Sequence, residues 1–248
     1  MDKNSKQEFE LGYTIKKENS TIENQMELIY QSNLIEGIRD YWIQTVKEGE
    51  DTKLKPVLTE HLDALKYVAE KYNLNLNNEE VKKTHFILMK DLIHTPGEYR
   101  KGGNSFIASH GNFILGNPLP KHVQELMDSW LEKTIKAERF EELLDLHYEY
   151  ELIHPFDDGN GRSGRLILNW LTLQKLGVYT IIEKQQREEY IRKIGEYRTN
   201  FKKEHPGIVF TTYDMLSKTT KDRMKREHIN YHKFLIDLFK RSDPDFNI

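Results

Sequence analysis

The sequence predicts an all-α protein, a helical bundle with one short β-hairpin. Along most of the chain, apolar residues recur at the three- and four-residue spacing of amphipathic helices, whereas two short β-prone runs lie between residues 105 and 115. Residues 166–176 are apolar on nearly every side, which predicts a buried central helix. With 248 residues, 37% of them hydrophobic, the chain is long enough to bury one sizeable core.

The first part of the chain changes character at residue 20. The residues before it are polar and of mixed charge, which favours an exposed or loosely docked arm. From Ser20 or Thr21, either of which can cap a helix N-terminus, the pattern predicts a helix that ends near Gly37. We therefore expect four segments: a polar N-terminal arm (1–19), a helical region (20–48), a core (49–200) and a C-terminal helical extension (201–248).

Within the core, Gly and Pro separate the periodic segments. Ser105–Ala108 and Asn112–Leu115 flank a Ser-His-Gly turn and predict a hairpin, and Val178–Ile182 is expected to be extended. Helices are predicted over residues 57–68, 79–93, 123–131, 139–153, 166–176 and from 186 onward.

Composition and charge argue against several classes of protein. There is no cysteine, so disulfides, zinc–cysteine sites and thiol catalysis are excluded. The net charge of -3 gives no overall electrostatic reason to expect nucleic acid. No run approaches 18 apolar residues and the first residues lack an apolar stretch, so we expect a cytoplasmic protein that does not bind membranes.

Residues 154–165 contain the densest group of chemically active side chains, His-Pro-Phe-Asp-Asp-Gly-Asn-Gly-Arg-Ser-Gly-Arg. His154 is the candidate general base, because a neutral imidazole with a pKa of roughly 6.5 can take a proton from a hydroxyl near pH 7. Asp158 can hold Mg²⁺ between phosphate oxygens, since this ion prefers one or two carboxylates together with substrate phosphates.

The same stretch offers a site for phosphate. Gly159, Asn160 and Gly161 can adopt the positive φ angles that turn successive N–H groups toward one anion, and the helix that follows adds partial positive charge. Arg162 and Arg165, three residues apart, fall on one helix face and can bind phosphate bidentately. A nucleotide with Mg²⁺ is therefore the expected ligand.

The stretch resembles the signature of the Fic family (filamentation induced by cAMP), His-x-Phe-x-[Asp/Glu]-Gly-Asn-Gly-Arg-x-x-Arg, at every specified position. The resemblance implies a Fic-type bundle and transfer of AMP from ATP to a Ser, Thr or Tyr hydroxyl of a target protein, with release of pyrophosphate. It also implies that Phe156 anchors the loop and that Asn160 cradles phosphate. Gly161 argues against a phosphorylating variant, which has Lys there, and leaves a phosphocholine-transferring variant open.

Upstream, Ser32-Asn33-Leu34-Ile35-Glu36-Gly37 resembles the family's inhibitory motif, [Ser/Thr]-x-x-x-Glu-[Gly/Asn]. A carboxylate can take the place of a terminal phosphate on an arginine, so Glu36 paired with Arg165 is expected to block productive ATP docking. The chain would then resemble the members whose inhibitory helix is N-terminal, with Ser32 and Glu36 as the inhibitory residues.

Two further assignments follow from the resemblance. The hairpin would dock an extended target segment, with Phe106 and Ile107 at the docking edge. Tyr190 is the candidate wall of the adenine pocket, although Tyr197 or Arg198 stands where relatives often have Asn, which leaves the base preference open.

The sequence also leaves other functions open. Glu36 could orient a water that removes AMP from a modified target, or the chain could be a non-catalytic nucleotide-binding regulator. The target protein is not identified by the sequence; it could be the chain itself, and a homo-oligomer is compatible with the family.

Overall fold

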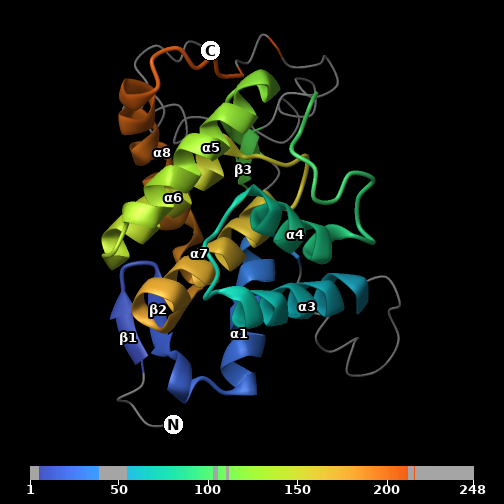
Figure 1. Ribbon diagram of the computed structural model, residues 1–248, viewed down its shortest axis with the longest axis vertical. Helices are drawn as coiled ribbons and strands as arrows, with labels where there is room; N and C mark the ends of the chain where they lie inside the picture. Colours follow the sequence, from blue (N-terminus) through green and yellow to red (C-terminus); the bar gives the residue numbers. More distant parts are fainter. Residues whose placement is uncertain (1–5, 39–54, 103–105, 110–111, 212–214, 216–248) are drawn as a thin grey trace.

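A computed structural model describes residues 6–38, 55–102, 106–109, 112–211 and 215 (Figure 1). The described part is predominantly helical, which confirms the predicted class, but it also contains a small antiparallel sheet. Among the described helices, none is long and apolar enough to cross a membrane. Residues 39–48 of the predicted helical region and most of the predicted extension after 201 lie outside the described residues.

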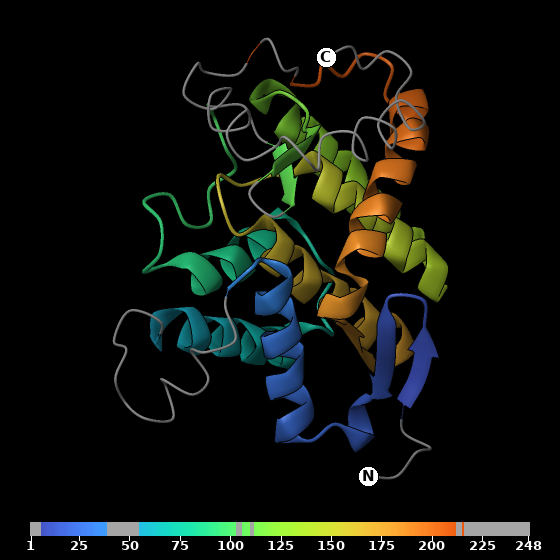
Figure 2. The ribbon, with the colours of Figure 1, turned by 180° about the vertical axis from the view of Figure 1, so that it is seen from behind.

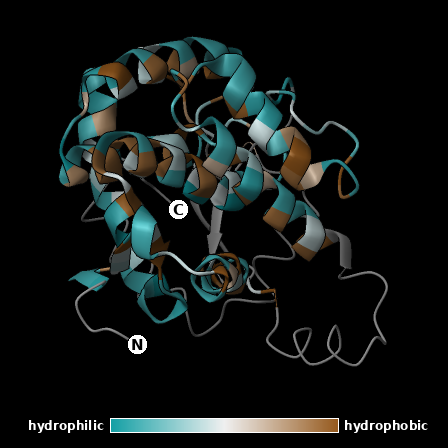
Figure 3. Ribbon diagram, turned by 60° about the horizontal axis from the view of Figure 1, so that its bottom comes forward, coloured by the Kyte–Doolittle hydropathy of each residue, from teal (hydrophilic) through white to brown (hydrophobic). Residues whose placement is uncertain are grey.

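The bundle is built around one central helix, α7 (Asn160–Leu176), whose first fourteen residues are almost all buried. The other helices pack around α7 or on its neighbours, and Figure 3 shows polar and apolar residues alternating along them, as expected where one helix face is buried. These helices are α1 (Ile22–Ile35), α3 (Lys55–Lys71), α4 (Asn78–Met89), α5 (Val123–Lys136), α6 (Phe140–Ile153) and α8 (Arg187–Glu204).

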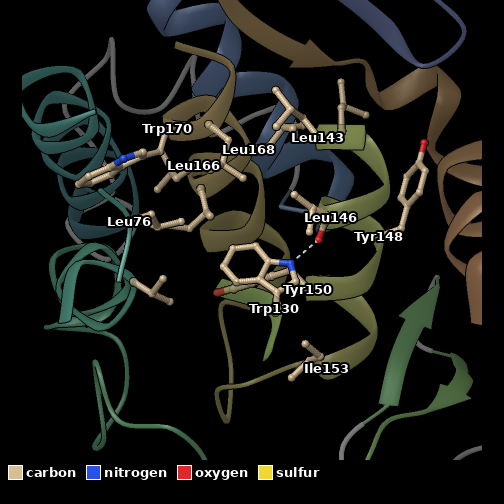
Figure 4. Close-up of a cluster of buried hydrophobic side chains, with 14 of the residues drawn as sticks. Leu76, Trp130, Leu143, Leu146, Tyr148, Tyr150, Ile153, Leu166, Leu168 and Trp170 are labelled. Carbon is tan, nitrogen blue, oxygen red and sulfur yellow. Dashed lines mark hydrogen bonds between the residues drawn. The ribbon is translucent and has the colours of Figure 1, made fainter. Parts of the chain in front are cut away.

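Large apolar side chains fill the space between α5, α6 and α7. Trp130 and Tyr150 are fully buried there, and the Trp130 indole nitrogen donates to the carbonyl of Leu146 at 2.8 Å (Figure 4). This bond removes the cost of burying the indole N–H without a partner. Trp170, also fully buried, lies on the side of α7 that faces α3, next to Tyr67. Burying each aliphatic neighbour contributes on the order of 1.5–3 kcal/mol. The packing makes α6 and α7 one rigid support for the loop between them.

The N-terminal residues are not the exposed arm that the sequence predicts. β1 (Lys6–Phe9) pairs with β2 (Gly12–Lys16), and β2 pairs antiparallel with β5 (Val178–Ile182), which follows α7 directly. Leu11, Tyr13 and Ile15 are buried at 1%, 7% and 1% exposure. Their alternation is a strand pattern, but it is short, lies among charged residues and is stabilised by a partner strand far along the chain.

Helix α1 follows this sheet and lies across the bundle against α3, α7 and β5 (Figure 2). Thr21 caps its N-terminus by accepting from the Asn24 N–H, and Asn24 returns a contact to the Thr21 N–H, so the predicted start is confirmed. The helix ends before Gly37, whose φ of 76° favours glycine. The sheet and the cap therefore fix the course of α1 toward Glu36.

The predicted hairpin is present as β3 (Phe106–Ser109) and β4 (Asn112–Gly116), antiparallel with an irregularity between Ile107 and Ala108. The side chains of Phe106 and Ile107 lie outside the described part, so only their backbone position in β3 is known.

Candidate active site

His154 stands at the end of α6 in a left-handed conformation, with φ 53° and ψ 62°. Among the described residues other than glycine, His154 is the one with a positive φ. A residue with a side chain is held in this backbone conformation only where surrounding contacts enforce it. The last carbonyls of α6 supply these contacts. Asn117 donates to the Leu152 carbonyl at 2.8 Å, and the Arg100 guanidinium donates to the Ile153 and His154 carbonyls at 3.2 and 2.7 Å. The turn is thereby capped and held.

The protonation state of His154 suits a base. Burial, together with the nearby Arg100 cation, lowers the pKa of His154 from 6.5 to about 4, so the ring is neutral at pH 7. Nδ1 lies 3.2 Å from the Glu151 carbonyl oxygen. Because that oxygen can only accept, Nδ1 carries the proton and Nε2 retains its lone pair. A neutral imidazole with an available Nε2 can accept a proton from a hydroxyl.

Phe156 anchors the loop after His154 in the core, as expected. Its ring is fully buried and stacks on the ring of His85 at 3.6 Å and 7°. Nδ1 of His85 accepts from the Gly97 N–H at 2.9 Å, so Nε2 carries the proton that it donates to the Asp158 carbonyl at 2.8 Å. His85 thus bridges the loop to α4.

Asn160 does something other than the role implied by the resemblance. Its side-chain oxygen accepts from the Phe156 N–H at 2.8 Å, and its side-chain nitrogen donates to the Phe156 carbonyl at 2.8 Å. Both polar groups of the amide are therefore used to close the loop, and the side chain is 2% exposed. In this structure Asn160 shapes the loop rather than offering its side chain to a phosphate.

The start of α7 has the features of an anion site, but only one glycine has the expected conformation. Gly159 is the N-cap with φ 75°, whereas Gly161 lies within the helix without a positive φ. The first intrahelical bond runs from the Ser163 N–H to the Gly159 carbonyl, so the N–H groups of residues 160–162 precede it. A Cβ on residue 161 would lie 2.2 Å from Oε1 of Glu36. Gly161 is therefore required for close approach of an acidic group.

That acidic group pairs with Arg165. Oε1 of Glu36 lies 2.6 Å from Nη2 of Arg165, and the same guanidinium donates to the Ser32 hydroxyl at 2.9 Å and to the Ser32 carbonyl at 2.8 Å. Arg165 is buried, whereas the Glu36 side chain is 37% exposed. Burial raises the pKa of Glu36, but the positive charge of Arg165 outweighs this effect and the pKa lies below 4.5. The carboxylate is ionised at neutral pH and occupies the start of α7.

Arg162 and Asp158 lie on the same loop and helix end. Arg162 is 7% exposed; burial lowers its pKa, and the negative charge of Glu36 partly offsets this. Asp158 is exposed, and its Oδ1 accepts from the Gly159 N–H at 2.6 Å. Among the described residues, no group of three or more His, Cys, Asp or Glu could hold a metal ion. A lone carboxylate fits a metal that takes its other ligands from phosphate and water.

The side chain of Tyr190, the candidate wall of the adenine pocket, is buried in the core. It is 3% exposed, its hydroxyl lies 2.8 Å from Nε2 of His147, and the two rings stack at 5.7 Å. Its ring is thus covered by the core beneath Arg165, because the first turn of α8 packs inward here.

Sequence reasoning also missed three residues that shape the site: His85, Arg100 and Asn117. Each is hydrogen-bonded to a backbone group far away in the chain; Arg100 and His154, for example, are 54 residues apart. The Gly-Glu-Tyr-Arg turn at residues 97–100 was the available signal.

Comparisons with known proteins repeatedly find Fic proteins. The Fic/DOC family profile matches residues 75–172. The protein adenylyltransferase fic-1 of Caenorhabditis elegans is 29% identical over 117 residues, which cover 42% of this chain and 23% of the relative. The protein adenylyltransferase Fic of Culex quinquefasciatus is 30% identical over 128 residues, or 46% and 25% of the two chains. The matched region spans about a quarter of the length of these relatives.

Solved structures show the same fold. A Fic domain containing signaling protein from Bacteroides thetaiotaomicron matches with a TM-score of 0.60 and 19% identity, covering 90% of this chain and 88% of that one. Fic-1 from C. elegans matches with a TM-score of 0.55 and 15% identity, covering 92% and 63%. At these identities the likeness concerns the fold alone. Residues 75–172, which include the loop from His154 to Arg165, match the Fic/DOC family in sequence, and the chain shares the fold of solved Fic proteins.

Proposed function

We propose that this chain is a protein adenylyltransferase, which transfers AMP from ATP to a Ser, Thr or Tyr hydroxyl of a target protein and releases pyrophosphate. The names of the curated relatives support this activity. The observation that carries the proposal is local: a neutral His154 with an available Nε2 is held in the same loop as a helix N-terminus that already accommodates an anion, the carboxylate of Glu36.

In the proposed reaction, Nε2 of His154 accepts the proton of the target hydroxyl while its oxygen forms a bond to the α-phosphorus of ATP. The bond from that phosphorus to the bridging oxygen breaks, and pyrophosphate leaves with the bonding electrons. The N–H groups at the start of α7 and the cations of Arg162 and Arg165 bind the phosphates and stabilise the charge that develops on them. Positioning and charge supply most of the rate enhancement.

Asp158 is the residue that would hold Mg²⁺, because it is exposed on the loop that binds the phosphates. The bound ion would supply neutralisation of the negative charge on the leaving phosphates. The protein's own contribution is to fix the carboxylate through the Gly159 N–H, which lies 2.6 Å from Oδ1.

We further propose that the protein is autoinhibited by Glu36. Its carboxylate pairs with Arg165 and fills the space beside Gly161 that the missing side chain leaves open. A terminal phosphate would use the same guanidinium and the same space. ATP docked with Glu36 in place would have to accept a different phosphate position, with its α-phosphorus displaced from the target hydroxyl. The target segment itself would pair with the β3–β4 hairpin as an added strand.

The test is the intact mass of purified protein after incubation with ATP and Mg²⁺, for the wild type, Glu36→Gly and His154→Ala in that background. A gain of one AMP in Glu36→Gly that is absent once His154 is removed supports the chemistry. His94→Ala is the matched control, because His94 is exposed and outside the loop. Full transfer by the His154→Ala protein would refute the role of the base, and a gain of one phosphate would refute AMP transfer.

A further inference from the structure

Arg100 is hydrogen-bonded to the catalytic turn through both its side chain and its backbone. It is 3% exposed, and its guanidinium donates through Nε to the His154 carbonyl and through Nη2 to the Ile153 carbonyl. Its own N–H donates to the Pro155 carbonyl at 2.9 Å. One residue therefore binds three successive carbonyls around the left-handed turn that presents the base.

The same guanidinium also reaches the far side of the hairpin. Nη2 donates to the Pro118 carbonyl at 2.5 Å. Arg100 precedes β3, which begins at Phe106, and Pro118 follows β4, which ends at Gly116. The contact therefore ties the two ends of the hairpin to each other and to the turn of His154.

We propose that Arg100 is a positioning residue that holds His154 and both ends of the β3–β4 hairpin in one frame, so that a hydroxyl presented on the hairpin meets Nε2 of the base. This inference rests on the proposed function. The chemistry requires a proton acceptor and a docked hydroxyl within hydrogen-bond distance, and these two parts come from segments more than 35 residues apart in the chain.

An arginine suits this role because its planar fork carries five N–H donors in fixed directions. Lysine has the same charge but no fork, and glutamine has two donors and no charge. Burial lowers the pKa of Arg100 to about 10, so it is still a cation at pH 7. That cation faces His154 together with the carboxylates of Glu36 and Asp158, and it opposes a second positive charge on the imidazole.

The experiment separates geometry from charge with Arg100→Lys and Arg100→Gln, both in Glu36→Gly. Asn117→Ala is the matched control, since Asn117 caps the same end of α6 through the Leu152 carbonyl without carrying charge. Three quantities are measured: kcat and KM for ATP in the mass assay, the titration of His154 by NMR, and exchange of the amide hydrogens of residues 152–156.

We expect both Arg100 variants to lower kcat by about 10- to 100-fold with KM for ATP within about twofold, because the base is misplaced while the phosphate site is kept. In Arg100→Gln the titration of His154 should move from about 4 toward 6.5, whereas Arg100→Lys should leave it near 4. Asn117→Ala should speed amide exchange at the helix end without moving this titration or reducing kcat to the same extent.

Unchanged kcat in both Arg100 variants, or an equal loss in Asn117→Ala, would overturn the proposal. If the Glu36→Gly protein itself transfers no AMP, the proposed function fails in this assay. The role of Arg100 is then still decided by the titration and by amide exchange: an unmoved titration in Arg100→Gln and unchanged exchange at residues 152–156 would refute it.

Discussion

Replacing Glu36 by Gln gives the sharpest test of the proposed inhibition, because the two side chains have the same shape and differ in charge. The variant loses the ionic component of the contact with Arg165, whose Nη2 lies 2.6 Å from Oε1 of Glu36. Arg165 keeps its bonds to the hydroxyl and carbonyl of Ser32, so the helix stays docked at that point. The change therefore weakens the closed state without removing α1.

The magnitude follows from the type and exposure of the contact. A hydrogen bond to a charged group contributes about 1.5–3 kcal/mol when it is buried. The Glu36 side chain is 37% exposed, and solvent screening lowers its contribution toward that of an exposed pair. We take about 1–2 kcal/mol, which corresponds to a factor of about 5 to 30 in the closed-to-open ratio. Glu36→Gly should give a larger gain, up to about a hundredfold if the closed state is favoured 99 to 1.

The assay is the initial rate of AMP incorporation by intact mass, combined with calorimetric binding of an ATP analogue that cannot be cleaved. Glu23→Gln is the matched control, since it makes the same chemical change on an exposed residue in the first turn of α1. Arg165 keeps the pKa of Glu36 below 4.5 despite burial, so the pairing is present above that pH and lost only as the pH falls through the lowered value. The gain should therefore be constant from pH 6 to 8. An unchanged rate and unchanged ATP affinity in both Glu36 variants would refute the reasoning.

Three other perturbations have defined outcomes. Arg187→Gln removes the donor that lies 2.6 Å from the last carbonyl of α1, and should raise the rate of AMP transfer by less than Glu36→Gln does. Gly161→Ala places a methyl carbon 2.2 Å from the position of the Glu36 oxygen, which the proposed inhibition assigns to a phosphate of ATP. In Glu36→Gly, where that oxygen is absent, the methyl group should still weaken ATP binding because it crowds the phosphate position, as calorimetry would reveal. His85, whose pKa is lowered from 6.5 to about 4 mainly by burial, stabilises the fold above pH 6.5, and this stability is lost as the pH falls toward 4. The free energy of unfolding, measured with urea, should thus fall by about 2 kcal/mol less in His85→Gln than in the wild type between pH 7.5 and 5.

The helices were predictable because each carries its own periodic pattern. The segment predicted at 79–93, for instance, is α4 at Asn78–Met89, and the helix predicted to end near Gly37 does so. The contact of Glu36 with Arg165, 129 residues apart, was predictable from charge and motif together. Local pattern and chemistry were sufficient where each residue's role depends on its own type.

The errors occurred where a role depends on distant backbone. Strand β2 is stabilised by pairing with β5, which lies more than 160 residues later, and β1 pairs with β2; no local pattern reveals the partner β5. The phosphate role of Asn160 is implied by the resemblance and stays a prediction, whereas the bonds of its side chain to the N–H and carbonyl of Phe156 could not be read from the sequence. The role of Arg100 was missed because its partners are backbone carbonyl groups far along the chain, which leave no side-chain pattern to match.

The contacts of α1 determine how inhibition can be released. At its start, α1 follows β2, which is paired with β5, and β5 is bonded in turn to α7 through Asn169 and Thr180. At its end, the Gln31 side chain accepts from the Lys184 N–H, and Arg187 caps the last carbonyl. Helix α1 is therefore built into the core rather than appended to it. Complete dissociation of α1 would break the sheet and cap contacts at once, whereas rotation of Glu36 breaks one ion pair. We expect activation to proceed by movement at the C-terminal end of α1, against the start of α8.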